Sequence, residues 1–72
     1  MNLDEKLKLI AETLDADPAA IIPSAGLSAL EEWDSMGVIS IIAMLDRKFG
    51  KILTAEQISS LCTVQDILDR ME

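Results

Sequence analysis

Two segments of the chain space their apolar residues three or four positions apart, and this spacing limits the fold more than any other feature. Intervals of four, three and four positions separate one set, Leu3, Leu7, Ile10 and Leu14. The same intervals separate a second set, Val38, Ile42, Leu45 and Phe49. Residues at such intervals share one face of an α-helix. The spacing therefore predicts amphipathic helices over residues 3–14 and 35–49, with Ile41 beside the second buried stripe.

Capping residues set the ends of these two helices. Asn2 is a suitable N-cap for the first helix, and Glu5 can complete a capping box with it. The first helix must end before Pro18, because proline disfavours a helical residue in front of it. Asp34 is a suitable N-cap for the second helix, and Gly50 is typical of the residue that ends a helix.

Two further capping boxes predict two shorter helices. The pairs that form them are Thr54 with Gln57 and Thr63 with Asp66. They predict helices over residues 55–61 and 64–71. The last of these carries an apolar stripe of four residues, Val64, Ile67, Leu68 and Met71.

Residues 16–33 form a long connection that contains both prolines of the chain and Gly26. We expect a short helical turn at residues 19–22. Four apolar residues are available to hold the connection against the core, namely Ile21, Ile22, Leu27 and Leu30. Connections of this length inside a compact domain are uncommon and often functional. We therefore expect an ordered loop rather than a free linker.

The length and composition suit one small helical domain, which we take to span residues 1–72. Apolar residues make up 50% of the chain, but Trp33 and Phe49 are the only aromatic ones. No segment has the alternating pattern of a strand. We predict an all-α fold, a small four-helix bundle with three main helices, one short helix and a long first loop. Cys62, Met44 and Met71 are expected in its core.

The charge of the chain bears on its partners and its location. Thirteen acidic and six basic residues give a net charge of −7. Such a chain is a poor match for nucleic acid and is suited to encounters with basic partners. No apolar run reaches the length of a membrane span, about 20 residues. The first residues lack the apolar segment of a signal peptide, and Cys62 alone cannot form an internal disulfide. We expect a monomer in the cytoplasm.

The residues that are missing also limit the chemistry. The chain has no histidine, which excludes Ser–His–Asp and Cys–His nucleophile arrangements within it. The ligand spacings of common metal sites are missing as well. Neighbouring acids such as Glu31 and Glu32 are expected on the surface, since so small a core offers no deep pocket for general acid–base chemistry. We expect no metal site and no catalysis by the chain itself.

Ser35 stands where the second helix begins, and two interpretations of it are open. Serine and aspartate are routine at helix starts, so Asp34 and Ser35 can simply satisfy backbone N–H groups there. The hydroxyl of Ser35 can instead be a point of covalent attachment. A phosphodiester at that place would be stabilised by the positive end of the helix dipole. The local residues do not decide between the two interpretations.

The wider sequence resembles the acyl carrier protein and peptidyl carrier protein family. In that family a D-S-L motif opens the second helix, F-G closes it and T-V-x-D/E-I opens the last helix. The matching segments here are "LEEWDSMGVISIIAMLDRKFG", "LTAEQI" and "TVQDILDRM", and "IIPSAGLSAL" resembles the family's long first loop. The resemblance implies that Ser35 carries 4′-phosphopantetheine, transferred from coenzyme A by a phosphopantetheinyl transferase. The thiol of that arm would hold acyl or aminoacyl groups as thioesters, so the chain would be a carrier and not an enzyme.

The resemblance also implies that loading and processing enzymes dock on the second helix and the loop before it. By position, the candidate docking residues are Trp33, Asp34, Met36, Ser40, Ala43 and Arg47. Carriers of the fatty-acid type have several acids on this helix, whereas Gly37 and small, apolar or cationic residues occupy that surface here. We therefore predict a specialised carrier, recognised partly through apolar contacts at Met36, Ala43 and Met44.

Some alternatives remain open at this point. Trp33 can be a loop anchor packed on the first helix or a contact for a partner. The cargo can be fatty acyl, aminoacyl or polyketide. A different class of function is an unmodified acidic adaptor that presents the second helix to a partner.

Overall fold

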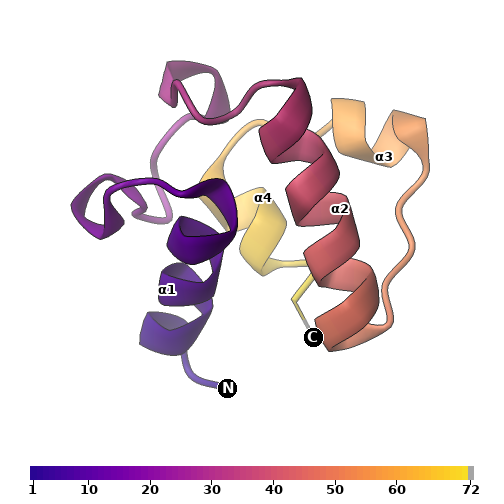
Figure 1. Ribbon diagram of the computed structural model, residues 1–72, viewed down its shortest axis with the longest axis horizontal. Coiled ribbons are helices and arrows are strands. Elements are labelled where there is room, and N and C mark those ends of the chain that lie inside the picture. The colour runs from indigo at the N-terminus through magenta and orange to yellow at the C-terminus, as the bar shows by residue number, and fades with distance from the viewer. Residues whose placement is uncertain (72) are drawn as a thin grey trace.

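A computed structural model describes residues 1–71 of the chain. It contains four α-helices and two single turns of 3₁₀ helix, in the order α1 (Leu3–Leu14), η1 (Pro18–Ala20), η2 (Leu27–Ala29), α2 (Ser35–Phe49), α3 (Ala55–Ser59) and α4 (Val64–Leu68). Figure 1 shows α1 and α2 on either side of α4, with α3 beside the N-terminal half of α2. No strand occurs within residues 1–71, and the predicted all-α fold is confirmed.

The two long helices have the predicted bounds, but the two short ones end earlier than expected. α3 stops at Ser59 rather than residue 61, and α4 stops at Leu68 rather than residue 71. Beyond α4 the chain continues in tight turns, in which the N–H of Met71 donates to the carbonyl of Leu68 at 3.0 Å. These shorter-range bonds tighten the chain and bring Met71 into the core, where it is fully buried.

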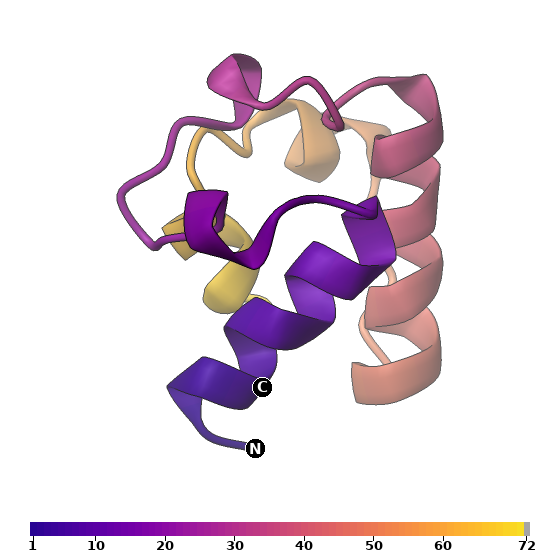
Figure 2. The same cartoon turned by 60° about the vertical axis from the view of Figure 1, so that its left-hand side comes forward.

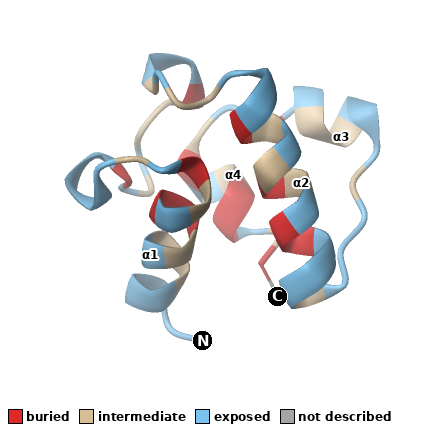
Figure 3. Ribbon diagram, viewed as in Figure 1, coloured by how far each residue is buried: buried red, intermediate tan, exposed pale blue. Residues whose placement is uncertain are grey.

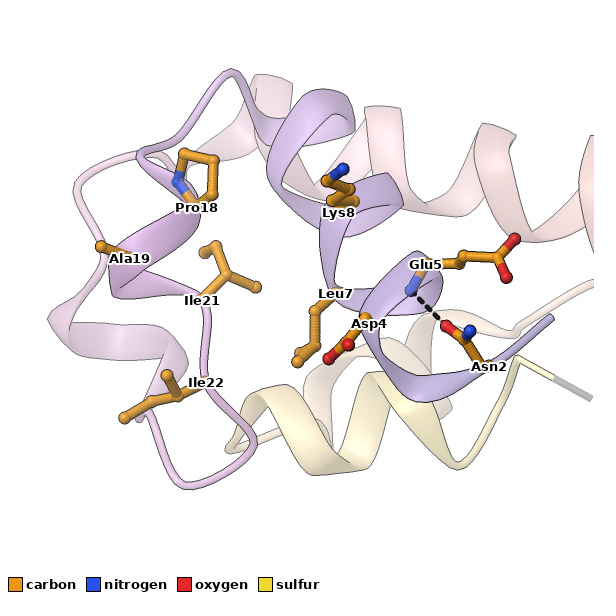
Figure 4. Close-up of a pocket in the computed structure, with 9 residues that line it drawn as sticks. All are labelled: Asn2, Asp4, Glu5, Leu7, Lys8, Pro18, Ala19, Ile21 and Ile22. Atoms are coloured by element: carbon orange, nitrogen blue, oxygen red, sulfur yellow. Dashed lines mark hydrogen bonds between the residues drawn. The ribbon is translucent and has the colours of Figure 1, made fainter.

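The helix starts follow the capping residues closely. Asp34 Oδ1 accepts the N–H of Gly37 at 2.9 Å. Both predicted capping boxes, at Thr54 and Thr63, form with their reciprocal bonds. The box predicted at Asn2 is only half formed: Asn2 accepts the N–H of Glu5 at 2.8 Å, whereas the side chain of Glu5 turns toward solvent (Figure 4).

The core lies where α1, α2 and α4 turn their buried faces toward one another (Figure 3). Its members are at most 7% exposed: Ile10, Ala11, Leu14, Ile21, Leu27, Ile41, Met44, Leu45, Leu61, Val64, Ile67, Leu68 and Met71. The predictions that Met44 and Met71 are core residues are confirmed. Cys62 was expected there too, but it is exposed. Its backbone N–H donates to the side chain of Asp66 and its carbonyl accepts from the N–H of Leu27, while its side chain lies on the surface.

The buried face of α2 differs from the predicted one. Of the stripe Val38, Ile42, Leu45 and Phe49, only Leu45 is buried and the other three are half-buried. The buried residues of the helix are instead Gly37, Ile41, Met44 and Leu45. The helix is thus turned about its axis so that glycine, its smallest residue, faces α1 and the loop.

The long loop is part of the packed structure, as expected. Ile21 and Leu27 are each 1% exposed, while Ile22 stays 49% exposed. Three backbone bonds tie the loop to the start of α4: Leu27 N–H to Cys62 O at 2.8 Å, Val64 N–H to Ala25 O at 3.0 Å and Gln65 N–H to Pro23 O at 3.0 Å. The helical turn expected at residues 19–22 occurs at Pro18–Ala20, where Asp17 caps it. None of the helices described combines the length and the apolar character needed to cross a membrane.

Candidate functional site

Ser35 is the first residue of α2 and is exposed. The end of α2 that carries it lies beside the C-terminal end of α1 and the end of the long loop (Figure 2). Within residues 1–71, no hydrogen bond engages its hydroxyl. The hydroxyl therefore lies on the surface with its hydrogen-bonding capacity unused by the described residues.

The backbone around Ser35 provides a positive local potential. Asp34 occupies two donors of the first turn, because its side chain accepts from Gly37 and its carbonyl accepts from Val38 at 2.9 Å. Among the described residues, the N–H groups of Ser35 and Met36 have no partner. Unpaired N–H groups at a helix start favour an anion. A phosphate on Ser35 fits this environment.

Gly37 brings the start of α2 against the loop. A Cβ atom at this position would overlap the carbonyl oxygen of Glu32 and would lie 3.0 Å from Leu14 Cδ2. The sequence-based prediction that Gly37 lies on the exposed surface is wrong, because the residue is buried. A signal was available: glycine inside a helix costs about 1 kcal/mol relative to alanine, so a close approach is a common reason for it.

The candidate docking residues fall into two groups. Asp34, Met36, Ala43 and Arg47 are exposed, with Met36 at 70%. Ser40 and Trp33 are half-buried, and Trp33 packs against the core cluster. Ile39 was not singled out from the sequence, although it is 59% exposed on the outer face of α2. Met44, predicted as an apolar contact, is only 6% exposed and so offers little surface.

A hollow of about 370 Å³ adjoins Ser35 between α1, the loop and α2. It is lined by Thr13, Leu14, Glu31, Glu32, Asp34, Met36, Gly37 and Ser40. A larger hollow of about 490 Å³ lies elsewhere, between the start of α1 and η1, with Leu7, Ile21 and Ile22 on its apolar side (Figure 4). None of the candidate site residues lines this second hollow. Over the described part of the chain, no group of three acidic, cysteine or histidine residues is placed to hold a metal ion.

Comparisons with known proteins agree on one family. The family model described as "Phosphopantetheine attachment site" matches residues 7–71. The acyl carrier protein of Thermosynechococcus vestitus is 35% identical over 66 residues, which cover 90% of this chain and 82% of that protein. The acyl carrier protein of Helicobacter pylori is 33% identical over 64 residues, covering 89% of this chain and 82% of its own length. No solved structure matches the chain significantly.

Proposed function

The chain belongs to the phosphopantetheine-attachment family that includes the acyl carrier proteins, and we propose that Ser35 is its attachment residue. The prosthetic group of this family is a covalently attached 4′-phosphopantetheine. The observation that carries the assignment is the position of Ser35, an exposed serine with a free hydroxyl directly after the N-cap of α2. The other serine of this helix, Ser40, is half-buried in its second turn.

The attachment reaction follows from the groups present. The hydroxyl oxygen of Ser35 attacks the β-phosphorus of coenzyme A while a phosphopantetheinyl transferase holds both molecules. A new O–P bond forms, the bond to the bridging oxygen of the diphosphate breaks, and 3′,5′-ADP leaves. The hydroxyl proton passes to a base on the transferase, because this chain has no histidine to take it. The resulting phosphodiester lies at the positive end of α2.

The function is to carry cargo rather than to transform it. The terminal thiol of the arm holds acyl or aminoacyl groups as thioesters, and the chain delivers them to the enzymes of a fatty-acid-like, polyketide or other specialised pathway. The curated relatives are named acyl carrier proteins, which supports acyl cargo in particular.

The outer face of α2 supports a specialised set of partners. Met36 and Ile39 present large apolar side chains there, and Ala43 and Arg47 are exposed beside them. Acids near the site are concentrated in the loop, at Glu31 and Glu32, and at Asp34. A partner that binds this face has an apolar area that contacts the helix and basic groups that contact the acids near the start of the helix.

Intact-mass measurement tests the proposal. The unmodified chain is incubated with coenzyme A and a broad-specificity transferase, and it should gain the mass of one phosphopantetheine. Ser35→Ala should gain none. Ser28→Ala, which removes an exposed serine of η2, should be modified like the wild type. If several transferases leave the wild type unmodified, an adaptor that acts without the arm becomes the better description.

A further inference from the structure

Two neighbouring hollows lie along the seam between α1 and α2. The hollow beside Ser35 and a second one of about 310 Å³ share two lining residues, Thr13 and Ser40. This 310 Å³ hollow is lined by Leu9, Thr13, Ser40, Ala43, Met44, Arg47 and Lys48. Together they form what we call the seam groove. It begins at the neighbours of Ser35 and ends at the last turn of α2.

The chemistry of the seam groove changes along its length. Near Ser35 it presents the acids Glu31 and Glu32, which can accept hydrogen bonds. Its middle is mainly apolar, with Ala43 and Met44 from α2 and Leu9 from α1. Thr13 adds no free donor, because its hydroxyl already donates to the carbonyl of Leu9 at 2.7 Å.

The far end of the seam groove is cationic. Arg47 and Lys48 line it and are both exposed. Within residues 1–71 no salt bridge joins either side chain to a carboxylate. Both also lie in the last turn of α2, where a positive charge interacts favourably with the helix dipole. Their charged groups can still bind an anion, because both side chains are exposed.

On the premise that Ser35 carries the arm, we infer that the arm lies in the seam groove and that its cargo is a short acyl group ending in a carboxylate. The order of groups in such a ligand matches the groove. The hydroxyl and two amide N–H groups of the arm come first and meet the acids, the thioester and carbon chain follow, and the terminal carboxylate meets Arg47 and Lys48.

The lengths agree with this order. The path along α2 from Ser35 to Arg47 rises about 18 Å, at about 1.5 Å per residue. The extended arm from phosphorus to sulfur spans about 15 Å, since its backbone has the length of roughly four residues. The thiol then lies near Ala43 and Met44, so only a short acyl group fits between it and the two cations. A long fatty chain would overshoot them.

Backbone NMR of the protein that carries the arm tests the path of the arm along the surface. Intact mass first establishes that the arm is attached, so a failure of the proposed function is recognised before this step. Amide shifts of the modified chain are then compared with those of the unmodified chain. The inference predicts changes at Thr13, Ser40 and Ala43. Changes confined to the immediate neighbours of Ser35, or lying instead at Leu53 and Ile58, would overturn it while leaving attachment intact.

The acidic cargo is tested with two acyl groups of equal carbon count. The chain is loaded from succinyl- and butyryl-coenzyme A, whose acyl groups end in a carboxylate and a methyl. Succinyl should shift Arg47 and Lys48 well beyond butyryl, and the combined change of Arg47→Gln and Lys48→Gln should abolish this difference. The same neutralisation at exposed Lys51, outside the groove, should leave it unchanged. Equal shifts from the two cargoes would contradict the assignment.

Discussion

Among single residues, Gly37 has the most direct influence on where Ser35 stands. It lies two positions after Ser35, donates its N–H to the Asp34 cap and lets the carbonyl of Glu32 approach the helix. The missing side chain is therefore what allows the loop and the start of α2 to meet. The position of Ser35 depends on this contact even though Gly37 carries no reactive group.

Replacing Gly37 by alanine should destabilise the protein by about 1–3 kcal/mol, because the added methyl overlaps the Glu32 carbonyl and the backbone must move. Alanine would be favoured by helix propensity alone, so the sign of the change is informative. Chemical denaturation gives the free energy of unfolding. Gly26→Ala is the matched control, since a Cβ there meets nothing within 4 Å and φ is −76°. That change should be neutral or slightly stabilising. A stabilised Gly37→Ala protein would contradict the packing described.

The residue-level predictions from sequence succeeded where local chemistry decides. Asp34, Thr54 and Thr63 cap their helices because the needed donors lie within three residues. The predictions for Gly37 and Cys62 were wrong. The environment of Gly37 depends on its packing against Leu14 and the loop, and that of Cys62 on its backbone bond with Leu27, which is distant in sequence. The proposed attachment role of Ser35 rests on the pattern of the whole chain, because a serine at the start of a helix is uninformative by itself.

Among the elements, α2 begins at a side-chain cap, Asp34. Asp34→Ala removes the bond to the Gly37 N–H and should cost about 1 kcal/mol. Asp34→Asn keeps an acceptor and should lie within a few tenths of a kcal/mol of the wild type. The free energies of unfolding of the two variants, measured by denaturation, distinguish the contribution of the capping hydrogen bond from that of the negative charge. Equal losses in both would show that the negative charge, and not the hydrogen bond, is what matters.

The start of α4 contains the clearest acid-sensitive contact. Asp66 Oδ2 accepts the N–H of Cys62 at 2.8 Å and that of Thr63 at 3.0 Å. The backbone bond from Cys62, and then that from Thr63, lower the pKa of Asp66 below its ordinary value of 3.8. Because the folded-state pKa is the lower one, the stabilisation is present above the ordinary value and is lost as pH falls through the folded-state value.

Asp66→Asn should therefore reduce the pH dependence of stability. The wild type loses the Asp66 contribution between about pH 5 and pH 2, whereas the amide does not titrate. Urea denaturation at both ends of this interval gives the two free energies of unfolding. The variant should be less stable than the wild type at the upper pH, and the gap should narrow at the lower one. A gap that widens on acidification would contradict the direction of the pKa shift.

The periodicity of apolar residues predicted the bounds of the long helices but not the face that α2 buries. Spacing predicted α1 and α2 at their observed bounds, because both are long and strongly periodic. It misjudged the face that α2 buries, since Met36 and Ile39 are apolar yet exposed, so apolar residues almost encircle the helix. The observed rotation places Gly37 against the carbonyl of Glu32, a close contact that the spacing of apolar residues does not reveal.

Over the whole molecule, charge is unevenly distributed. Residues 1–35 contain eight acids and two bases, whereas residues 36–72 contain five acids and four bases. On α2 itself the only acid is the exposed Asp46, which is followed by Arg47 and Lys48, so the helix offers little acidity to steer the protein to a basic docking patch. Its apolar Met36 and Ile39 suit partners with a complementary apolar contact.

Adding an acid to this face should improve recognition by general fatty-acid enzymes. Ile39→Glu should raise the rate of loading by about two- to tenfold at low salt, and the gain should shrink as ionic strength rises. Ile52→Glu is the control, because Ile52 is 81% exposed but lies outside α2. If the wild type is already loaded by those enzymes as fast as by the enzymes of its own pathway, the specialised recognition proposed above is wrong.

Fragmentation mass spectrometry of the modified chain shows whether Ser35 alone carries the arm. The chain contains five other serines, Ser24, Ser28, Ser40, Ser59 and Ser60, so the modified position can be resolved among real alternatives. Every fragment that contains Ser35 should have the added mass, and fragments without Ser35 should not. The added mass on another serine, or a chain that no transferase modifies, would contradict the proposed attachment at Ser35.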